Sequence, residues 1–353
     1  MTRIAFIITS KGKPGGVERR FLRVAEFLDN RPSTECFVVG SASFLSSFNL
    51  DQANKVELKA TSLMRRVVEI TLFVRQCGIS HVHIASNPGL LSVFLCAIMR
   101  TLGKKVSISS VNSSKVKRQD FGLRSRISHR LTYSLANRVD FLSDSILEKH
   151  QELFGVSKSK GRVSECSFLA NKLEAVQAGE RDIDLCFVAR LVPLKGIELL
   201  LDALSEMQST LNVRICGDGP MKNYIDSRVE AIKHHNIYVG YCENPIDTLS
   251  RSKIFLSLQA YNNYPSQSVF EAIKSGCLVI ATDVGETRKI LNDENSILIK
   301  DKAALVSAIE TALKNDGLRE SLINESRKVF QKHNIKSFSG YFKTEILGLE
   351  SSL

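Results

Sequence analysis

Two cations stand close together between a strand-like and a helix-like pattern. Arg190 and Lys195 lie in the segment FVARLVPLKGIELLLDAL, with Gly196 at the start of the helical part. A guanidinium can bind two phosphate oxygens as a fork, and an ammonium acts as a point charge beside it. Together the two side chains can neutralise a diphosphate. The alternative is a pair of solvated surface cations.

Glycine turns follow two other strand patterns. Gly15 and Gly16 follow IAFIIT and open a helix, where close backbone approach and free N–H groups suit a phosphate. A plain strand-to-helix turn explains this pair equally well. Gly217 and Gly219, in VRICGDGPM, allow a tight turn that we predict to form a wall of a nucleotide site. Asp218 is disfavoured as a metal ligand, because no second carboxylate is spaced to share the ion.

A fourth stretch, AYNNYPSQSVFEAIKSG, carries the most polar side chains. Ser266, Gln267 and Ser268 place N–H groups and hydroxyls at a predicted helix start, which again favours an anion. Glu271, further into that helix, can accept hydrogen bonds from two ribose hydroxyls. If it stood alone, an ordinary glutamate on a helix face would be the better interpretation.

All four stretches follow β-branched runs that alternate with helical patterns. Strand alternating with helix predicts the α/β class with parallel sheets. We expect two doubly wound, Rossmann-like domains that face each other across a cleft, with boundaries at 1–165 and 166–330. The residues 331–353 are helical in pattern and are expected to pack back on the first domain. Ligands of such sheets bind outside the carboxyl ends of the strands.

Length and composition exclude several classes of protein. With 353 residues, 43% of them hydrophobic, the chain is too long for one small module and too apolar for disorder. Its eight cysteines include no CxxC pair, so we expect buried free thiols in a reducing compartment. No apolar run approaches the ~20 residues of a membrane span, and the run at 4–8 is too short for a signal peptide.

The positive charge lies in the first half of the chain. Residues 1–165 hold 26 Lys and Arg against 13 Asp and Glu, whereas residues 166–353 hold 22 against 24. Much of the excess lies in SSKVKRQDFGLRSRISHR, which favours phospholipid head groups, nucleic acid or phosphorylated substrates. A merely solvated basic face is the alternative. Nucleic acid is the least favoured partner, because the segment holds one aromatic residue, Phe121, and no known binding module.

Taken in order, GGVERRF, ARLVPLKGIELLLDAL, ICGDGP and NNYPSQSVFEAIKSGCLVIATDVGETRKIL resemble the retaining GT-B glycosyltransferases of the group 1, or family-four, type. The resemblance implies a nucleotide-diphosphate sugar as donor, retention at the anomeric carbon, and neither a metal nor a cofactor. By position it implies that Gly16, Arg190 and Lys195 contact the phosphates, with amides from residues 266–268. Glu271 would bind the ribose, and the backbone at 239–241, ending in Tyr241, would border the base.

The sequence departs from this family at three positions. Asn263, next to Asn262, stands where the family has a sugar-facing glutamate, and Asn112 stands nearest to a family histidine. We take both asparagines as the candidate sugar-facing catalytic residues. Glu286 replaces the second glycine of a GG pair and is expected to touch the donor sugar or to mark a different one. His81 and His83 are predicted to be strand residues that are satisfied locally.

The expected function is transfer of a sugar, most simply from a UDP-sugar, to a glycan or lipid-linked acceptor in bacterial surface polysaccharide or lipopolysaccharide synthesis. We expect a cytoplasmic protein that is peripheral on the inner face of an anionic membrane. The alternative is a catalytically degenerate GT-B protein that binds nucleotide or glycan without transfer. A nucleotide-sugar epimerase would share the architecture.

Overall fold

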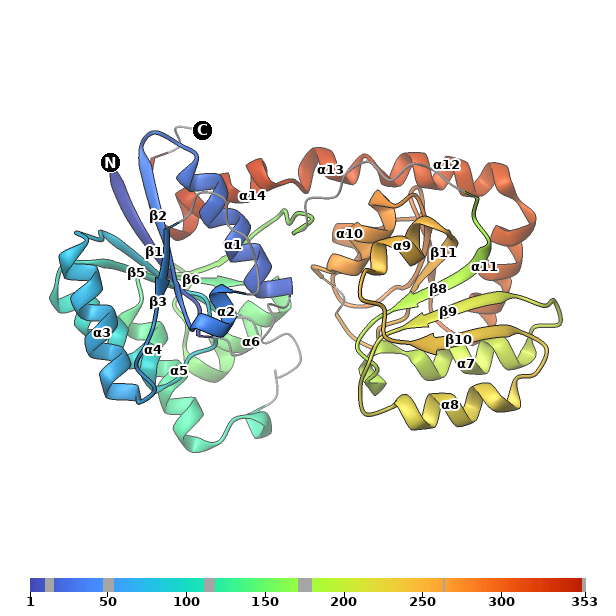
Figure 1. Cartoon of the computed structure of the whole chain (residues 1–353), viewed down its shortest axis with the longest axis horizontal. Coiled ribbons are helices and arrows are strands. Elements are labelled where there is room, and N and C mark those ends of the chain that lie inside the picture. Colours follow the sequence, from blue (N-terminus) through green and yellow to red (C-terminus); the bar gives the residue numbers. More distant parts are fainter. Residues whose placement is uncertain (10–15, 47–53, 111–117, 171–179, 263, 351–353) are drawn as a thin grey trace. The chain divides into compact units, whose positions relative to one another are not determined.

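The computed structural model of the chain describes residues 1–9, 16–46, 54–110, 118–170, 180–262 and 264–350. Its contacts divide the chain into two compact units (Figure 1). Unit 1 holds Met1–Ala170 together with His333–Leu353, and unit 2 holds Asn171–Lys332. The division falls at 170–171, against the boundary expected at 165–166, and the chain returns to unit 1 at its end.

Unit 1 is built on a parallel sheet of seven strands in the order β3-β2-β1-β4-β5-β6-β7. Every described pair in this sheet runs parallel. The strands are β1 (Thr2–Ile7), β2 (Thr34–Gly40), β3 (Asn54–Glu57), β4 (His81–Ile84), β5 (Lys105–Ser110), β6 (Arg138–Phe141) and β7 (Gly161–Val163).

The direction of the crossovers places the helices of unit 1 on two faces. From β3 onward each connection moves the same way along the sheet, and right-handed crossovers therefore put α3 (Leu63–Gln76), α4 (Leu90–Thr101), α5 (Leu123–Leu135) and α6 (Asp144–Phe154) on one face. The connections from β1 to β3 run the other way, so α1 (Gly16–Asp29) and the short α2 (Ala42–Leu45) cover the opposite face. A 3-10 turn at Arg118–Asp120 precedes α5.

The returning C-terminal segment completes the second of these faces. It forms α14 (Ile335–Tyr341), followed by a π-helical turn at Phe342–Ile346, and α14 packs beside α1 (Figure 1). Phe338 and Phe342 are buried in one cluster with Phe21 of α1 and Phe6 of β1. The core of this face therefore requires residues from both ends of the chain.

Unit 2 repeats the architecture with a parallel sheet of six strands in the order β10-β9-β8-β11-β12-β13. The strands are β8 (Ile183–Val188), β9 (Asn212–Cys216), β10 (Asn236–Gly240), β11 (Ser252–Ser257), β12 (Leu278–Thr282) and β13 (Ile297–Ile299). The helices are α7 (Ile197–Glu206), α8 (Lys222–Ala231), α9 (Pro245–Ser250), α10 (Gln267–Lys274), α11 (Lys302–Lys314), α12 (Asp316–Ser326) and α13 (Val329–Lys332), with 3-10 turns at Pro193–Lys195 and Thr287–Lys289. The α/β class with two doubly wound parallel sheets, expected from the alternating patterns, is confirmed.

One expectation about the cysteines is wrong. Cys216 and Cys242 are joined in a disulfide, while the other six remain thiols. The sheet explains the pairing, because Cys216 ends β9 opposite Gly240 of β10, and Cys242 follows two residues beyond. Sequence spacing could not show this, since the two cysteines are 26 positions apart. Among the described helices, none has the length and apolar content needed to cross a membrane.

Candidate functional site

The residues singled out in unit 2 follow the carboxyl ends of its strands. The loops after β8 and β11 lie next to each other, because these two strands are neighbours in the sheet. Connections from β8 lead toward β10, and connections from β11 lead toward β13. The strand order thus reverses between β8 and β11, which is where open α/β sheets bind ligands. Arg190 and Lys195 lie in one of the two loops, and Ser266 ends the other.

Arg190 and Lys195 carry charges that the described part of the chain does not neutralise. Neither side chain has a hydrogen-bond or ion-pair partner among the described residues. Arg190 is exposed, whereas Lys195 is half-buried, and burial lowers the pKa of the Lys195 ammonium from its ordinary value of 10.5. Desolvating an unpaired ammonium costs free energy that an anionic ligand would restore. The pair therefore has the character of an anion-binding site.

The two loops are locked together at Gly196. This residue caps α7 with a φ of +76°, and a Cβ built there would lie 1.7 Å from the carbonyl oxygen of Leu258. A few residues away, the amide of Ala260 donates to the carbonyl of Leu194 at 3.0 Å. A side chain at 196 would thus separate the loop that carries Lys195 from the loop after β11.

Gly217 and Gly219 support the loop of Arg190. A Cβ on Gly217 would lie 1.9 Å from the carbonyl oxygen of Ala189. The amide of Leu191 donates to the carbonyl of Asp218 at 2.9 Å. The turn after β9 therefore contacts the loop after β8 at the residues on both sides of Arg190. The predicted contact of these glycines with nucleotide stays a prediction. What the structure shows is that they allow two backbones to approach each other.

Helix α10 begins beside these loops with the predicted polar residues. Ser266 is its N-cap residue but makes no side-chain cap bond, and its hydroxyl lies 3.2 Å from that of Ser268. Gln267 is the first residue of the helix. Glu271, one turn further on, is only 9% exposed and is therefore no ordinary solvated glutamate. Its predicted role toward ribose stays a prediction.

Asn262 is a structural residue of this region that sequence reasoning named only as a neighbour. Its side-chain oxygen accepts the amides of Tyr264 at 3.0 Å and Glu286 at 3.1 Å. It thereby ties the loop after β11 to the loop after β12. The carboxylate of Glu286 lies 2.7 Å from the ammonium of Lys289, which sits over the ring of Tyr264. Glu286 is thus engaged within the protein, a pairing that the sequence analysis did not foresee.

The remaining predicted site residues differ in what the structure says of them. Tyr241 follows β10 and is 68% exposed, so its ring is accessible to a base. Gly16 is the first residue of α1, directly after the loop that follows β1. Gly15, Asn112 and Asn263 lie outside the described residues.

A buried polar network in unit 1 holds the start of α1. Asp140 of β6 accepts hydrogen bonds from the hydroxyls of Ser109 at 2.8 Å and Tyr341 at 2.9 Å, and Arg20 of α1 lies 3.6 Å away. Burial raises the pKa of the Asp140 carboxyl, while Arg20 and the two hydroxyls oppose that rise. Because Arg20 lies one turn beyond Gly16, the network fixes the helix start at which a phosphate contact is predicted.

His83 belongs to the same network and is satisfied locally, as expected. Its Nδ1 lies 2.9 Å from the hydroxyl of Ser107, and its Nε2 lies 3.2 Å from that of Ser109. Burial lowers the pKa of His83 to about 3, so the imidazole is neutral. His81 has one such partner, the hydroxyl of Ser80, and its Nε2 has none among the described residues.

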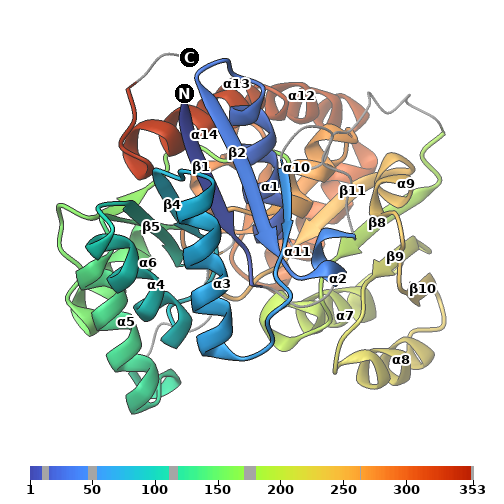
Figure 2. The ribbon, with the colours of Figure 1, turned by 60° about the vertical axis from the view of Figure 1, so that its left-hand side comes forward.

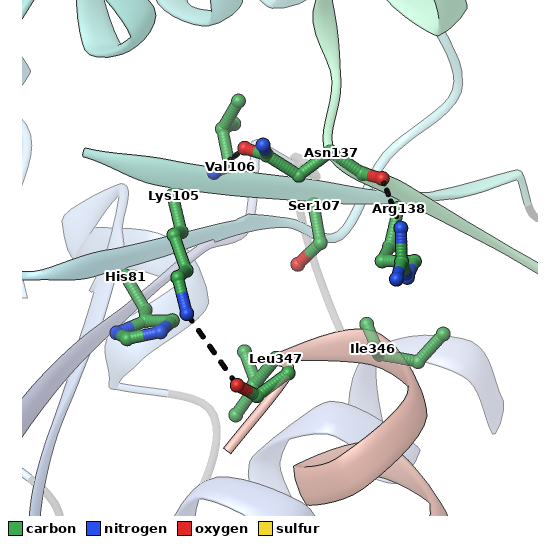
Figure 3. A pocket seen from close by; sticks show the side chains of 9 residues that line it. His81, Lys105, Val106, Ser107, Asn137, Arg138, Ile346 and Leu347 are labelled. Atoms are coloured by element: carbon green, nitrogen blue, oxygen red, sulfur yellow. Dashed lines mark hydrogen bonds between the residues drawn. The ribbon is translucent and has the colours of Figure 1, made fainter. Parts of the chain in front are cut away.

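A pocket of about 220 Å³ lies at the amino ends of the strands in the sheet of unit 1 (Figure 3). It is lined by residues at the amino ends of β4, β5 and β6 and by the C-terminal segment, including His81, Lys105 and Arg138. The ammonium of Lys105 donates to the carbonyl of Gly348 across it. Since ligands of parallel sheets bind at the carboxyl ends of the strands, this pocket lies away from the predicted phosphate loop of unit 1. No group of three or more His, Cys, Asp or Glu is placed to hold a metal ion within the described ranges.

Comparison with known proteins finds a family match for part of the chain and a fold match for nearly all of it. Residues 171–329 match the family model described as glycosyl transferases group 1. A 2-deoxystreptamine N-acetyl-D-glucosaminyltransferase of Niallia circulans is 22% identical over 55% of this chain and 54% of its own length. A putative teichuronic acid biosynthesis glycosyltransferase, TuaC of Bacillus subtilis (strain 168), is 31% identical over 33% of this chain and 29% of its own length. The matches thus span about half or less of these relatives.

The solved structures extend the likeness to nearly the whole chain. Anabaena Alr3699/HepE, solved in complex with UDP and glucose, superposes with a TM-score of 0.75 at 14% identity. The superposition covers 96% of this chain and 97% of that one. Such low identity shows the fold alone, whereas the family match is confined to residues 171–329, the region that carries Arg190, Lys195 and Glu271. Residues 171–329 are thus similar to the glycosyl transferases group 1 family, in a chain with the GT-B fold.

Proposed function

We propose that the protein is a glycosyltransferase that moves a sugar from a nucleotide-diphosphate donor to a hydroxyl of a glycan or lipid-linked acceptor. The biological setting that we propose is bacterial surface polysaccharide or lipopolysaccharide synthesis. The observation that carries the proposal is the pair of Arg190 and the half-buried Lys195, which have no side-chain partner among the described residues. They lie at the strand-order reversal of the region that matches the group 1 family. The names of the two relatives, both glycosyltransferases, support it.

The proposed donor is a UDP-sugar. Support comes from the complex of HepE with UDP and glucose, which shares the fold. In this chain Arg190 and Lys195 would hold the diphosphate, with amides at the start of α10. Glu271 would accept the ribose hydroxyls, and the exposed ring of Tyr241 would border the base.

The proposed reaction proceeds with retention and without a cofactor or metal ion. The acceptor oxygen bonds to the anomeric carbon on the face from which the bond to the diphosphate oxygen breaks. The acceptor proton passes to that leaving oxygen, so the products are the glycoside and UDP. Arg190 and Lys195 would offset the negative charge that grows on the leaving group, a task that a divalent cation performs elsewhere. Transfer should therefore continue in the presence of a chelator.

We also propose that the protein works on the cytoplasmic side, as a peripheral protein on an anionic membrane. The excess of basic residues in 1–165 supports the attraction, and a lipid-linked acceptor would require it. Nucleic acid is no part of the proposal. Since Cys216 and Cys242 are bonded, the cysteines no longer argue for a reducing compartment.

The test combines binding and turnover. UDP affinity and UDP-sugar turnover would be measured for the parent protein, Arg190→Ala, Lys195→Ala and the control Lys314→Ala, whose side chain is highly exposed at the end of α11. Loss of a charge-assisted bond costs about 1.5–3 kcal/mol, so each site variant should bind UDP roughly ten- to a hundredfold more weakly. The control should bind like the parent. Equal binding by all four proteins would reject the site.

The same assay decides the alternative of a binding protein without transfer. UDP binding that depends on Arg190 and Lys195, with no product from any UDP-, GDP- or ADP-sugar, would favour the degenerate protein. A changed sugar formed from the donor without any acceptor would instead indicate an epimerase.

A further inference from the structure

Three neighbouring helices of unit 1 expose an unusual set of side chains. Helix α3 packs beside α4, and α4 packs beside α5, on one face of the sheet (Figures 1 and 2). Their exposed large apolar residues are Met64, Val68 and Leu72 on α3, Leu90 and Phe94 on α4, and Leu123, Ile127 and Leu131 on α5. We call these residues, with the exposed arginines named below, the α3–α5 face.

The spacing shows that the exposure is organised. On α3 and on α5 the apolar side chains recur every four residues, so each set forms a stripe along its helix. Met64, Leu90 and Leu123 are more than half exposed, at 57%, 56% and 65%. Within the described part of unit 1, Met1 is the one further exposed large apolar residue. Single exposed apolar residues are common in proteins, but a concentration of this kind marks an interaction site.

The exposed charged side chains of the same face are all cations. Its exposed charged residues are Arg65, Arg75, Arg100, Arg124 and Arg130, and no residue exposed on α3, α4 or α5 is acidic. The one carboxylate of these helices, Glu69, is half-buried and accepts the amides of Lys59 and Ala60. All residues of the three helices are described.

The next helix on the same face of the sheet shows that this pattern is local. The exposed residues of α6 are Asp144, Ser145, Glu148, Lys149 and Glu152, an ordinary solvated surface. A general tendency of unit 1 to expose apolar groups would have included α6. The face therefore ends where α5 meets α6.

We propose that the α3–α5 face is the surface by which the protein docks on an anionic lipid bilayer. This inference rests on the proposed membrane association and says which residues carry it. The apolar stripes would enter the boundary between head groups and acyl chains, while the arginines reach back to the phosphates with their flexible stems. A bilayer fits better than a second protein, because it matches one sign of charge spread over several helices and demands no fixed geometry.

The combination predicts two separable contributions to binding. Attraction between arginines and anionic lipid is screened by salt, since the Debye length falls from about 10 Å at 0.1 M to about 3 Å at 1 M. Insertion of apolar side chains is not screened. At low salt, a variant without the arginines should thus bind more weakly than the parent, and at high salt this difference should disappear. A variant without the stripe should bind more weakly than the parent at every salt concentration.

The experiment measures binding of the whole protein to phosphatidylcholine vesicles with and without phosphatidylglycerol. The stripe variant is Leu123→Ser/Ile127→Ser/Leu131→Ser, and the charge variant is Arg124→Gln/Arg130→Gln. Matched controls are Glu148→Ser/Lys149→Ser/Glu152→Ser on α6, and Lys314→Gln/Lys328→Gln in unit 2. We expect the parent and both controls to prefer vesicles with phosphatidylglycerol. The stripe and charge variants should each lose about tenfold or more in affinity for them.

Several results would overturn the inference. One is equal binding of the parent to both kinds of vesicle, and another is binding of the stripe variant at the parent's level. A parent that is dimeric, with a monomeric stripe variant and no vesicle binding by either, would assign the face to a second copy of this chain. UDP affinity and thermal unfolding of each variant show whether it is folded. If only the docking inference is wrong, UDP affinity still depends on Arg190 and Lys195. If the proposed function is wrong, Arg190→Ala and Lys195→Ala bind UDP as the parent does.

Discussion

The burial of Lys195, a single residue, indicates an anion-binding site. A half-buried ammonium without a described partner destabilises the ligand-free protein, because burial disfavours its charged form. Chains tolerate such costs chiefly where the group acts on a ligand, and perturbed pKa values gather at functional sites for this reason. Arg190 adds a guanidinium, whose planar fork can bind two phosphate oxygens.

The lowered pKa of Lys195 gives the first prediction. Only the ammonium attracts a diphosphate, so this part of the UDP affinity is complete at neutral pH and is lost as pH rises through the lowered pKa. An ordinary surface lysine would lose it only near pH 10.5. In Lys195→Arg the charge persists, so UDP affinity should fall less between neutral and alkaline pH than in the parent. Titration calorimetry across this range measures both slopes, and identical slopes would contradict the prediction.

At the scale of elements, the site depends on two loops that approach within van der Waals distance. The loop after β8 and the loop after β11 meet where Gly196 faces Leu258, and the turn after β9 braces the first loop from its other side. These backbone contacts help to set where Arg190 and Lys195 lie relative to α10.

Gly196→Ala tests this arrangement. The substitution combines a positive φ with a collision against a backbone oxygen, so unit 2 should lose more than the ~1 kcal/mol that strain alone costs. UDP affinity should fall as well. The matched control is Gly155→Ala, since Gly155 has a φ of +70° and nothing within 4 Å of a built Cβ. If denaturant unfolding and UDP binding changed equally little in both variants, the bracing role of Gly196 would be wrong.

The helices and strands could be predicted from the sequence, whereas the contacts between different loops, strands and helices could not. Alternating strand and helix patterns predicted two doubly wound sheets and placed Arg190, Lys195 and Ser266 at strand ends, because those patterns are local. The disulfide of Cys216 with Cys242 and the clamp at Asn262 join segments from different loops or strands. Such contacts follow from strand order, which hydrophobic periodicity does not determine. The α3–α5 face depends likewise on which helices become neighbours.

At the scale of the molecule, the polar network around Asp140 joins the two ends of unit 1. Tyr341 of α14 donates to a carboxylate that also faces Arg20 of α1. Tyr341→Phe leaves Asp140 with one donor fewer, and an unsatisfied buried acceptor costs about 1–3 kcal/mol. We expect the free energy of unfolding of unit 1 to fall by this amount and that of unit 2 to stay unchanged.

Hydrogen exchange resolved by peptide reads the two units separately. Tyr224→Phe serves as the control, because the Tyr224 hydroxyl bonds Arg228 at an exposed site. Unchanged protection of α1 and β6 in Tyr341→Phe would show that the network does not stabilise this end of the unit.

Buried histidines predict that acid destabilises unit 1. Burial lowers the pKa of His83 to about 3 and those of His81 and His150 to about 4. The unfolded chain takes up these protons near pH 6.5, so stability is complete above that value and declines as pH falls toward the folded pKa values. Between about pH 7.5 and 5.5, His83 alone should cost about 1.4 kcal/mol. Asp140 opposes the trend only near its own raised pKa.

The variant His83→Asn should flatten this decline, since asparagine does not titrate. Chemical unfolding of parent and variant at the two pH values, followed through exchange in unit 1, provides the comparison. A parent whose unit 1 is as stable at the lower pH as at the higher would contradict the assignment of neutral buried imidazoles.

The return of the C-terminal segment to unit 1 also orders events on the ribosome. The residues of α14 that seal the face of α1 are translated only after the whole of unit 2. A domain usually folds as a unit once its residues have emerged. Unit 2 can therefore finish folding first. Until the last residues emerge, Phe6 and Phe21 of the nascent unit 1 lack the cover of α14, and we expect chaperones to bind unit 1 during this interval.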